Sequence, residues 1–176
     1  DLFRAIELGG TLPLARIADS HPKDCKKALD EGAGGIIAPM IESAEQLKII
    51  RDACCWPPTG TRGVGFSRAN LFGKHFDDYK QEAQVPLLVA QIEHNNAVNN
   101  LEEILQVEGL DAIIIGPYDL SASMGLTAEF EHKEFVAVMD QIINLCKQYD
   151  VPCGDHVVQP DTELLKKRIF QGYRFI

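Results

Sequence analysis

Residues 86–93 read PLLVAQIE and residues 112–119 read AIIIGPYD, and these two stretches decide the fold. Each is an apolar run that ends in one carboxylate, Glu93 in the first and Asp119 in the second. Continuous apolar runs of this length are typical of parallel strands that are buried on both faces. The sequence therefore predicts a parallel α/β sheet with an acid just beyond the carboxyl end of two strands.

Strand-like and helix-like segments alternate along the rest of the chain. Repetition of strand and helix predicts right-handed βαβ units, which build a parallel sheet. Strands are expected at 12–17, 35–40, 86–93, 112–119 and 151–158, with the start of a sixth at 173–176. Helices are expected at 22–31, 43–55, 96–106, 131–149 and 161–171.

The length of the chain limits the architecture that these units can form. A closed eight-stranded barrel takes about 250 residues, whereas this chain has 176. Either the sheet is small and open, or the chain is most of a barrel with both ends missing. The sequence starts inside a helix and stops inside a strand, which favours the second alternative. We therefore expect residues 1–176 to form a single domain, an incomplete (β/α)8 barrel that lacks the first two strands and most of the last.

Composition restricts the classes of partner. Hydrophobic residues make up 45% of the chain and the formal net charge is −9, with no run of Lys and Arg longer than the three at 166–168. Nucleic acid and membrane are therefore not expected as partners, and no apolar stretch approaches the ~20 residues of a membrane span. The five cysteines are odd in number and contain no C-x-x-C pair, which favours reduced thiols and a cytoplasmic location.

The two acids predict a metal site. Carboxyl ends of parallel strands meet at one edge, so we expect Glu93 and Asp119 to lie close enough to share a hard divalent cation. Two carboxylates fill only part of an octahedral shell, which water and a chelating α-keto acid would complete. Either acid alone fits a helix start equally well, since Asp and Glu are favoured there.

Three further residues are candidates for the same site. Gln91 precedes Glu93 by two positions, so both side chains point to the same side of the strand. Arg16 ends an apolar strand, where its guanidinium either forms a salt bridge or lies beside a developing enolate oxygen. Asp30, in the last turn of a helix, either is merely exposed or orients a basic group.

Four motifs, in this order, resemble the HpcH/HpaI aldolase family. They are LDEGAGGI at 29–36 followed by Pro39, PPTGTRGVG at 57–65 followed by RAN at 68–70, QIE at 91–93, and GPYDLS at 116–121 followed by Gly125. The resemblance implies a (β/α)8 barrel and a class II pyruvate aldolase, such as 4-hydroxy-2-oxo-heptanedioate aldolase or 2-dehydro-3-deoxyglucarate aldolase. Such enzymes cleave a 4-hydroxy-2-oxo acid to pyruvate and an aldehyde, and they commonly form homo-oligomers, often hexamers.

The resemblance also implies roles for individual residues. Glu93 and Asp119 match the ligands of a divalent metal, which would be Mg²⁺, Mn²⁺ or Co²⁺. Gln91, with the backbone at Tyr118 and Asp119, matches the groups that contact the keto acid. Arg16 matches the arginine that stabilises the enolate.

This sequence departs from the family pattern at the general base. By resemblance, Asp30 would raise the basicity of a catalytic histidine, but that histidine belongs to an Asp-x-Glu-His motif that the 176 residues do not contain. We therefore expect this chain to bind metal weakly at best and to turn over little. Two alternatives stay open: an acyl-CoA ester lyase like the citrate lyase β-subunit, with Arg62, Arg68 and Lys74 near the CoA phosphates, or an inactive fragment that serves as a binding module.

Overall fold

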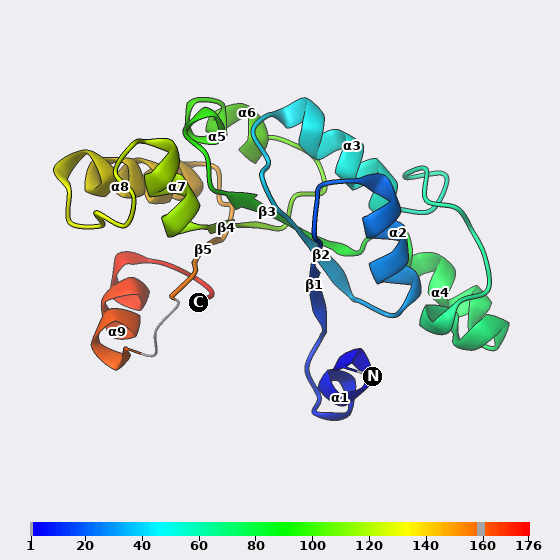
Figure 1. The fold of residues 1–176 in the computed structure, drawn as a ribbon. Coiled ribbons are helices and arrows are strands. Elements are labelled where there is room, and N and C mark those ends of the chain that lie inside the picture. The colour runs from blue at the N-terminus through cyan, green and yellow to red at the C-terminus, as the bar shows by residue number, and fades with distance from the viewer. Residues whose placement is uncertain (1, 158–160) are drawn as a thin grey trace.

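The computed structural model describes residues 2–157 and 161–176, which form a curved parallel sheet with helices on one side (Figure 1). Within this described part the sheet has five strands, in the spatial order β1-β2-β3-β4-β5. They are β1 (Leu14–Arg16), β2 (Gly35–Ala38), β3 (Leu87–Ile92), β4 (Ala112–Ile115) and β5 (Cys153–Asp155). Every neighbouring pair is parallel, as the sequence predicts.

The expected sixth strand is present only as a single bridge between Phe175 and Gly154. The strand predicted to end at Val158 stops at Asp155 in the structure, and Val158 itself lies outside the described residues.

Helices join the strands, as the predicted alternation requires, although the two at 76–82 and 117–123 were not expected from the sequence. They are α1 (Leu2–Leu8), α2 (Pro22–Asp30), α3 (Ala44–Cys54), α4 (Phe76–Glu82), α5 (Asn95–Asn99), α6 (Leu101–Leu105), α7 (Pro117–Ser123), α8 (Lys133–Gln148) and α9 (Thr162–Gln171), with a 3₁₀ segment η1 (Arg68–Gly73). The helix expected over 96–106 is two short helices, because the backbone leaves helical geometry at Asn100. The long loop over residues 59–74 contains η1 and is otherwise irregular.

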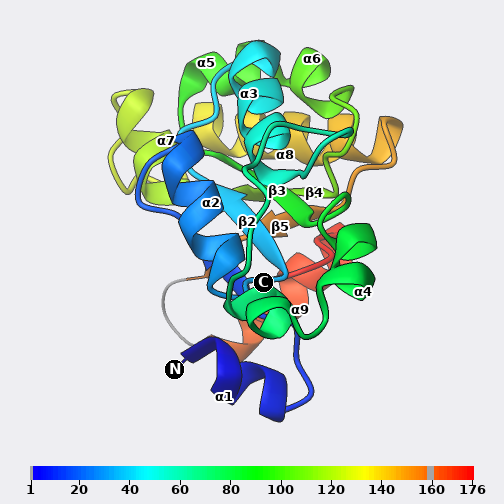
Figure 2. The same ribbon diagram turned by 90° about the vertical axis from the view of Figure 1, so that its right-hand side faces the viewer.

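The two faces of the sheet differ in what covers them. Helices α2, α3, α6 and α8 lie over one face, while α1 and α9 stand beyond the two ends of the arc (Figures 1 and 2). Strand residues alternate between faces, so Leu88, Ala90 and Ile92 of β3 face the helices and are fully buried. Gln91 of the same strand and Arg16 of β1 lie on the opposite face and are only partly buried or exposed. We call this second side the open face.

Parallel strands also give the sheet two distinct edges. All carboxyl ends lie at one edge, which we call the carboxyl edge, and all amino ends lie at the other, the amino edge. Each helix returns the chain from the carboxyl edge of one strand to the amino edge of the next. Side chains that follow a strand and side chains that end a helix therefore lie at opposite edges.

The core beneath the helices holds all five cysteines, which are buried and free. Of the described helices, none has the length and apolarity that a membrane crossing demands.

A second, smaller core holds the long loop against α4. The side chain of Arg62 is fully buried, and its guanidinium carbon lies 5.7 Å from the ring centroids of both Trp56 and Tyr79. Its Nη2 donates to the Tyr79 hydroxyl at 3.2 Å, and its Nη1 lies 3.5 Å from Oδ1 of Asp30. The loop is therefore organised by one arginine that contacts α2, α4 and the segment after α3.

Candidate active site

Glu93 is the first residue after β3, and its side chain is buried at the carboxyl edge, with the residue 1% exposed. One carboxylate oxygen, Oε1, accepts a hydrogen bond from the backbone N–H of Met40 at 2.8 Å. The other, Oε2, accepts one from the Gln91 side-chain amide at 2.7 Å. Each carboxylate oxygen can accept two bonds, so the carboxylate is held in one orientation and keeps capacity for a further ligand.

The environment of Glu93 favours its neutral form. Burial is the main reason that the pKa of this carboxyl is raised, and the nearby charge of Asp119 raises the pKa further. The Met40 N–H, the Arg16 guanidinium and the Gln91 amide oppose this change. A cation bound beside both carboxylates would offset the cost of burying one and the repulsion between the two.

Arg16 extends the same polar row across the open face. Its Nε donates to the Gln91 side-chain oxygen at 3.4 Å, and its Nη1 donates to the carbonyl of Ile17 at 3.2 Å. Arg16 is in register with Ile37, which in turn is in register with Val89, so its long side chain spans β2 to reach β3. The structure thus brings Arg16, Gln91 and Glu93 into one connected chain of hydrogen bonds.

Asp119 and Tyr118 approach this row from the neighbouring strand. β4 ends at Ile115, earlier than predicted, and Pro117 begins α7, so both residues lie in the first turn of that helix and are exposed. The Tyr118 ring packs edge-on against Phe130 with centroids 5.0 Å apart. Backbone N–H groups in a first helical turn have no partner within the helix, so those of Tyr118 and Asp119 are available to an anionic group.

Gly116 lies directly against the Glu93 side chain. A Cβ atom at this position would lie 2.8 Å from Glu93 Oε2 and 3.1 Å from Gln91 Nε2. The backbone φ of −98° at Gly116 is accessible to any residue. Glycine is therefore required here by the space that the Glu93 carboxylate and Gln91 amide occupy.

Gly116→Ala is accordingly expected to displace the Glu93 carboxylate and to weaken Mn²⁺ binding by about tenfold, as for other changes beside a metal ligand. Binding is measured by the electron paramagnetic resonance signal of free Mn²⁺. The matched control is Gly65→Ala, since a Cβ there would meet nothing within 4 Å. Unchanged Mn²⁺ affinity in Gly116→Ala would show that the carboxylate position does not matter for binding.

The donor set fits a hard divalent cation that keeps open coordination positions. Across residues 2–157 and 161–176, no group of three or more His, Cys, Asp and Glu side chains is arranged to hold a metal. The protein would therefore supply two carboxylates, from Glu93 and Asp119. Oxygen ligands of this kind suit Mg²⁺ or Mn²⁺, with water and substrate oxygens in the remaining positions.

Asp30 is the one predicted site residue that the structure does not bring to this edge. It ends α2, and that helix runs from the carboxyl edge of β1 back to the amino edge. Its carboxylate pairs with Lys26 Nζ at 2.6 Å and with Arg62 at 3.5 Å. In this chain Asp30 therefore belongs to the Arg62 core and not to the row that contains Glu93.

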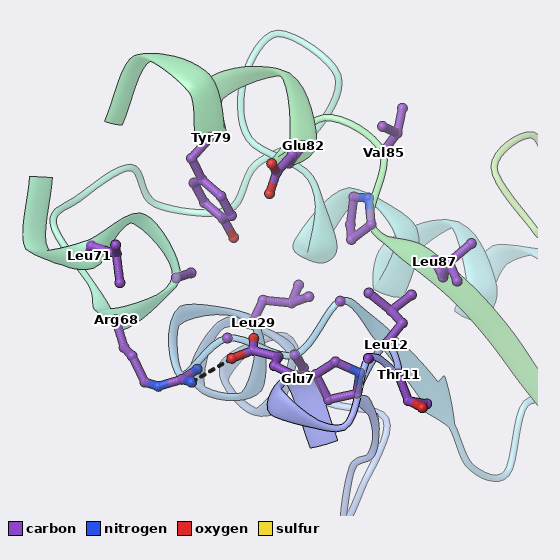
Figure 3. Close-up of a pocket in the computed structure, with 17 residues that line it drawn as sticks. Glu7, Thr11, Leu12, Leu29, Arg68, Leu71, Tyr79, Glu82, Val85 and Leu87 are labelled. Carbon is purple, nitrogen blue, oxygen red and sulfur yellow. Dashed lines mark hydrogen bonds and ion pairs between the residues drawn. The ribbon is translucent and has the colours of Figure 1, made fainter. Parts of the chain in front are cut away.

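A large cavity in the described part of the chain is also separate from this row. It has a volume of about 590 Å³ and is lined by residues at the amino edge, by α1, η1 and α4 (Figure 3). Arg68 at its margin pairs with Glu7 at 2.9 Å and donates to the carbonyl of Glu31, at the end of α2. None of the predicted site residues lines this cavity.

Two residues of the site had no role in the sequence-based prediction. Met40 supplies a backbone N–H, and no side-chain pattern could reveal that contribution. Gly116 lies in the GPYD motif, where a glycine between a buried strand and a helix is a signal for close packing.

Comparison with known proteins places this geometry in a family. The model of the HpcH/HpaI aldolase/citrate lyase family matches residues 2–176. The chain is 36% identical to a 2-dehydro-3,6-dideoxy-6-sulfogluconate aldolase from Pseudomonas putida, over 99% of this chain and 68% of the relative. It is 34% identical to a hydroxypyruvate/pyruvate aldolase from Roseobacter denitrificans, over 100% of this chain and 69% of the relative.

Solved structures agree. A crystal structure of an HpcH/HpaI aldolase/citrate lyase family protein from Burkholderia cenocepacia superposes with a TM-score of 0.91 at 31% identity, over 98% of this chain and 69% of that one. A citrate lyase β subunit from Mycobacterium tuberculosis, solved with oxaloacetate and magnesium, shares the fold with a TM-score of 0.61 at 15% identity, over 91% of this chain and 64% of that one.

The chain belongs to the HpcH/HpaI aldolase/citrate lyase family. This confirms both the predicted family and the predicted fold, an incomplete (β/α)8-type barrel. Its relatives are named aldolases, which are carbon–carbon lyases acting on small molecules.

Proposed function

We propose that this chain carries the metal and keto-acid half of a divalent-metal-dependent pyruvate aldolase, whose reaction splits a 4-hydroxy-2-oxo acid into pyruvate and an aldehyde. The observation that supports this most is the buried Glu93 carboxylate, oriented by two donors at the carboxyl edge. Barrel enzymes do their chemistry at that edge. The relatives named as aldolases support the same reaction class.

Glu93 and Asp119 would hold the cation, for which we propose Mg²⁺, Mn²⁺ or Co²⁺. When bound, such an ion supplies Lewis acidity, which favours negative charge on a keto oxygen nearby. Glu93 suits this role because its carboxylate is already fixed by Met40 and Gln91, so little orientational freedom is lost on binding.

Arg16 and Gln91 would stabilise the charge that develops when the C3–C4 bond breaks. The electron pair of that bond moves into the enolate of pyruvate, whose oxygen becomes negative. Arg16 places a permanent cation on the open face, next to the Gln91 amide. Preorganised donors of this kind contribute most where water is partly excluded.

The first turn of α7 would bind the carboxylate of the keto acid. The free N–H groups of Tyr118 and Asp119 point out of the helix start, where the helix dipole also favours an anion. Fixing the carboxylate there would orient the neighbouring keto group toward Arg16 and Gln91.

The reaction also needs a base that removes the proton of the C4 hydroxyl. Neither Arg16, a permanent cation, nor Gln91, an uncharged amide, can accept that proton, and Glu93 is assigned to the metal. We therefore propose that this chain binds the metal and the keto acid but exchanges protons and cleaves substrate slowly.

The test measures Mn²⁺ binding to the 176-residue chain with and without oxalate, a planar mimic of the pyruvate enolate. We expect oxalate to tighten Mn²⁺ binding, because one oxygen from each end of oxalate and the side chains of Glu93 and Asp119 would share one ion. Deuterium exchange into the methyl group of pyruvate, followed by proton NMR in D₂O, should be slow and dependent on Mn²⁺. Mn²⁺ alone is the blank. If oxalate leaves Mn²⁺ affinity unchanged and exchange equals the blank, the proposal fails.

The acyl-CoA lyase alternative has less support from the structure. Arg62 is buried in the small core, and Arg68 is paired with Glu7 and caps α2. Both arginines that were expected to contact CoA phosphates therefore already have protein partners.

We further propose a homo-oligomer in the cytoplasm. Several large apolar side chains of the loop around η1 are exposed, namely Val64, Phe66, Leu71 and Phe72. Apolar patches of this kind often mark interfaces between chains. The five buried free thiols fit a reducing compartment.

A further inference from the structure

The turn between β2 and α3, residues 39–43, holds the backbone N–H that donates to Glu93 Oε1, that of Met40. At its centre, Met40 has a φ of +50° and is 41% exposed. A residue with a side chain is strained in this left-handed region and persists there only where its surroundings enforce it. The Met40 side chain is partly exposed and so is not fixed by packing. Hydrogen bonds to the Met40 backbone therefore hold it in the left-handed conformation.

Gln46 supplies those hydrogen bonds from the first turn of α3. Its side-chain Nε2 donates to the Met40 carbonyl at 3.1 Å, and its Oε1 accepts from the Glu42 N–H at 2.9 Å. In a capping box, Gln46 would bond back to the backbone of Ser43. Here only the Ser43 half of that arrangement is present, since Ser43 Oγ accepts from the Gln46 N–H at 3.2 Å.

The far end of the turn is fixed as well. Asn100 Nδ2 donates to the Glu42 carbonyl at 2.9 Å, which ties the turn to the start of α6. With Glu42 held on both its N–H and its carbonyl, the Gln46 amide fixes the Met40 carbonyl, which lies in the peptide group between Met40 and Ile41. The Met40 N–H lies in the preceding peptide group, whose Pro39 carbonyl accepts a hydrogen bond from Ser20 Oγ. The Met40 N–H then points at the Glu93 carboxylate.

We propose that Gln46 is a positioning residue for the metal site. By holding the Met40 carbonyl, it helps to keep the Met40 backbone in its left-handed conformation, and the Met40 N–H then fixes the Glu93 carboxylate for the cation. The inference rests on the proposed function, because it takes Glu93 as a metal ligand. Gln46 acts on that carboxylate through the Met40 backbone, whose carbonyl and N–H belong to the two peptide groups joined at the Met40 Cα.

Gln46→Glu separates this role from simple helix capping. The glutamate still accepts from the Glu42 N–H, and its charge suits a helix start, so the cap and the fold should be retained. It cannot donate to the Met40 carbonyl, so the Met40 backbone loses the hydrogen bond that holds it on that side. Gln46→Ala removes both bonds, and Glu45→Gln is the matched control on an exposed neighbouring position.

Two measurements read out the effect, and the first needs no metal. The Met40 amide, protected in the wild type by Glu93, should exchange with solvent several-fold faster in both Gln46→Glu and Gln46→Ala. Mn²⁺ affinity should fall by about tenfold in both, the range typical of groups that orient a metal ligand. The thermal midpoint of Gln46→Glu should stay close to that of the wild type.

The outcomes separate the inference from the proposed function. If Gln46→Glu keeps wild-type Met40 exchange and Mn²⁺ affinity, Gln46 is only a helix cap and the inference is wrong. If Met40 exchange rises but Mn²⁺ affinity stays the same even in Glu93→Gln, the hydrogen-bond chain is real and the metal role of Glu93 is wrong. That second result would overturn the proposal through the function on which it rests.

Discussion

Glu93→Gln is expected to weaken Mn²⁺ binding by more than about 100-fold while leaving the fold intact. The substitution removes one of only two carboxylates in the donor set, which exceeds the effect of changing a group that merely orients a ligand. The glutamine has the same shape, and its oxygen still accepts from the Met40 N–H, although the bond that Oε2 accepts from the Gln91 amide is lost. Affinity is measured by the Mn²⁺ resonance titration, and the fold by circular dichroism.

The same variant should be more stable than the wild type at neutral pH in the absence of metal. Burial raises the pKa of Glu93 above its ordinary value of 4.5, so the folded state binds the proton more tightly than the unfolded state. The stabilisation from that proton is complete below pH 4.5 and is lost as pH rises through the folded pKa. The advantage of Glu93→Gln should therefore be absent in acid and appear toward pH 7.

Urea denaturation at several pH values checks this dependence. Glu103→Gln, at an exposed position of α6, is the control and should change neither stability nor Mn²⁺ affinity. A Glu93→Gln protein that is less stable than the wild type at pH 7 would mean that the carboxylate is held for the fold and not for a cation.

Arg62→Met is expected to lower the free energy of unfolding by about 3 kcal/mol, the size seen when one partner of a buried ion pair is removed. Three contacts disappear together: the ion pair with Asp30, the bond to the Tyr79 hydroxyl and the stacking on Trp56. Asp30 keeps Lys26 as a partner, which holds the loss below the upper end of the range. Urea denaturation followed by far-ultraviolet circular dichroism measures it.

Two further variants test the cause of that loss. Arg62→Lys keeps the charge but lacks the planar group that reaches several partners at once, so most of the stability should still be lost. Arg4→Met, at an exposed arginine of α1, should change stability by less than about 0.5 kcal/mol. A small effect for Arg62→Met would show that the glycine-rich loop is held by other contacts.

The sheet and the candidate site row were largely predictable because both depend on periodicity. Apolar runs located the strands, and the period of two placed Gln91 and Glu93 on one side. Parallel order then put Arg16 at the same edge. Motif resemblance added the roles, which stay predictions until the variants are measured.

Motif resemblance and chain direction differ on Asp30. The motif groups it with the site, whereas the helix that carries it ends at the amino edge of the sheet. Its role of raising the basicity of a catalytic histidine stays a prediction.

Backbone contributions explain what the sequence could not reveal. A methionine at position 40 gives no indication that this residue adopts the left-handed conformation or that its N–H donates to the Glu93 carboxylate. The sequence offered Arg62 only as a possible contact for CoA phosphates. Its burial depends on aromatic partners such as Tyr79, which is 17 positions away in the sequence. Such contacts become visible only with coordinates.

The strict order β1-β2-β3-β4-β5 has a consequence for how the chain is made. Each strand pairs with the one that precedes it in the sequence, so pairing can proceed in the order of synthesis. The β2–β3 connection is long, residues 39–86, but the entropic cost of closing a connection grows only slowly with its length. A nascent chain can therefore extend this sheet one strand at a time as it leaves the ribosome, with each new helix covering the pair already formed.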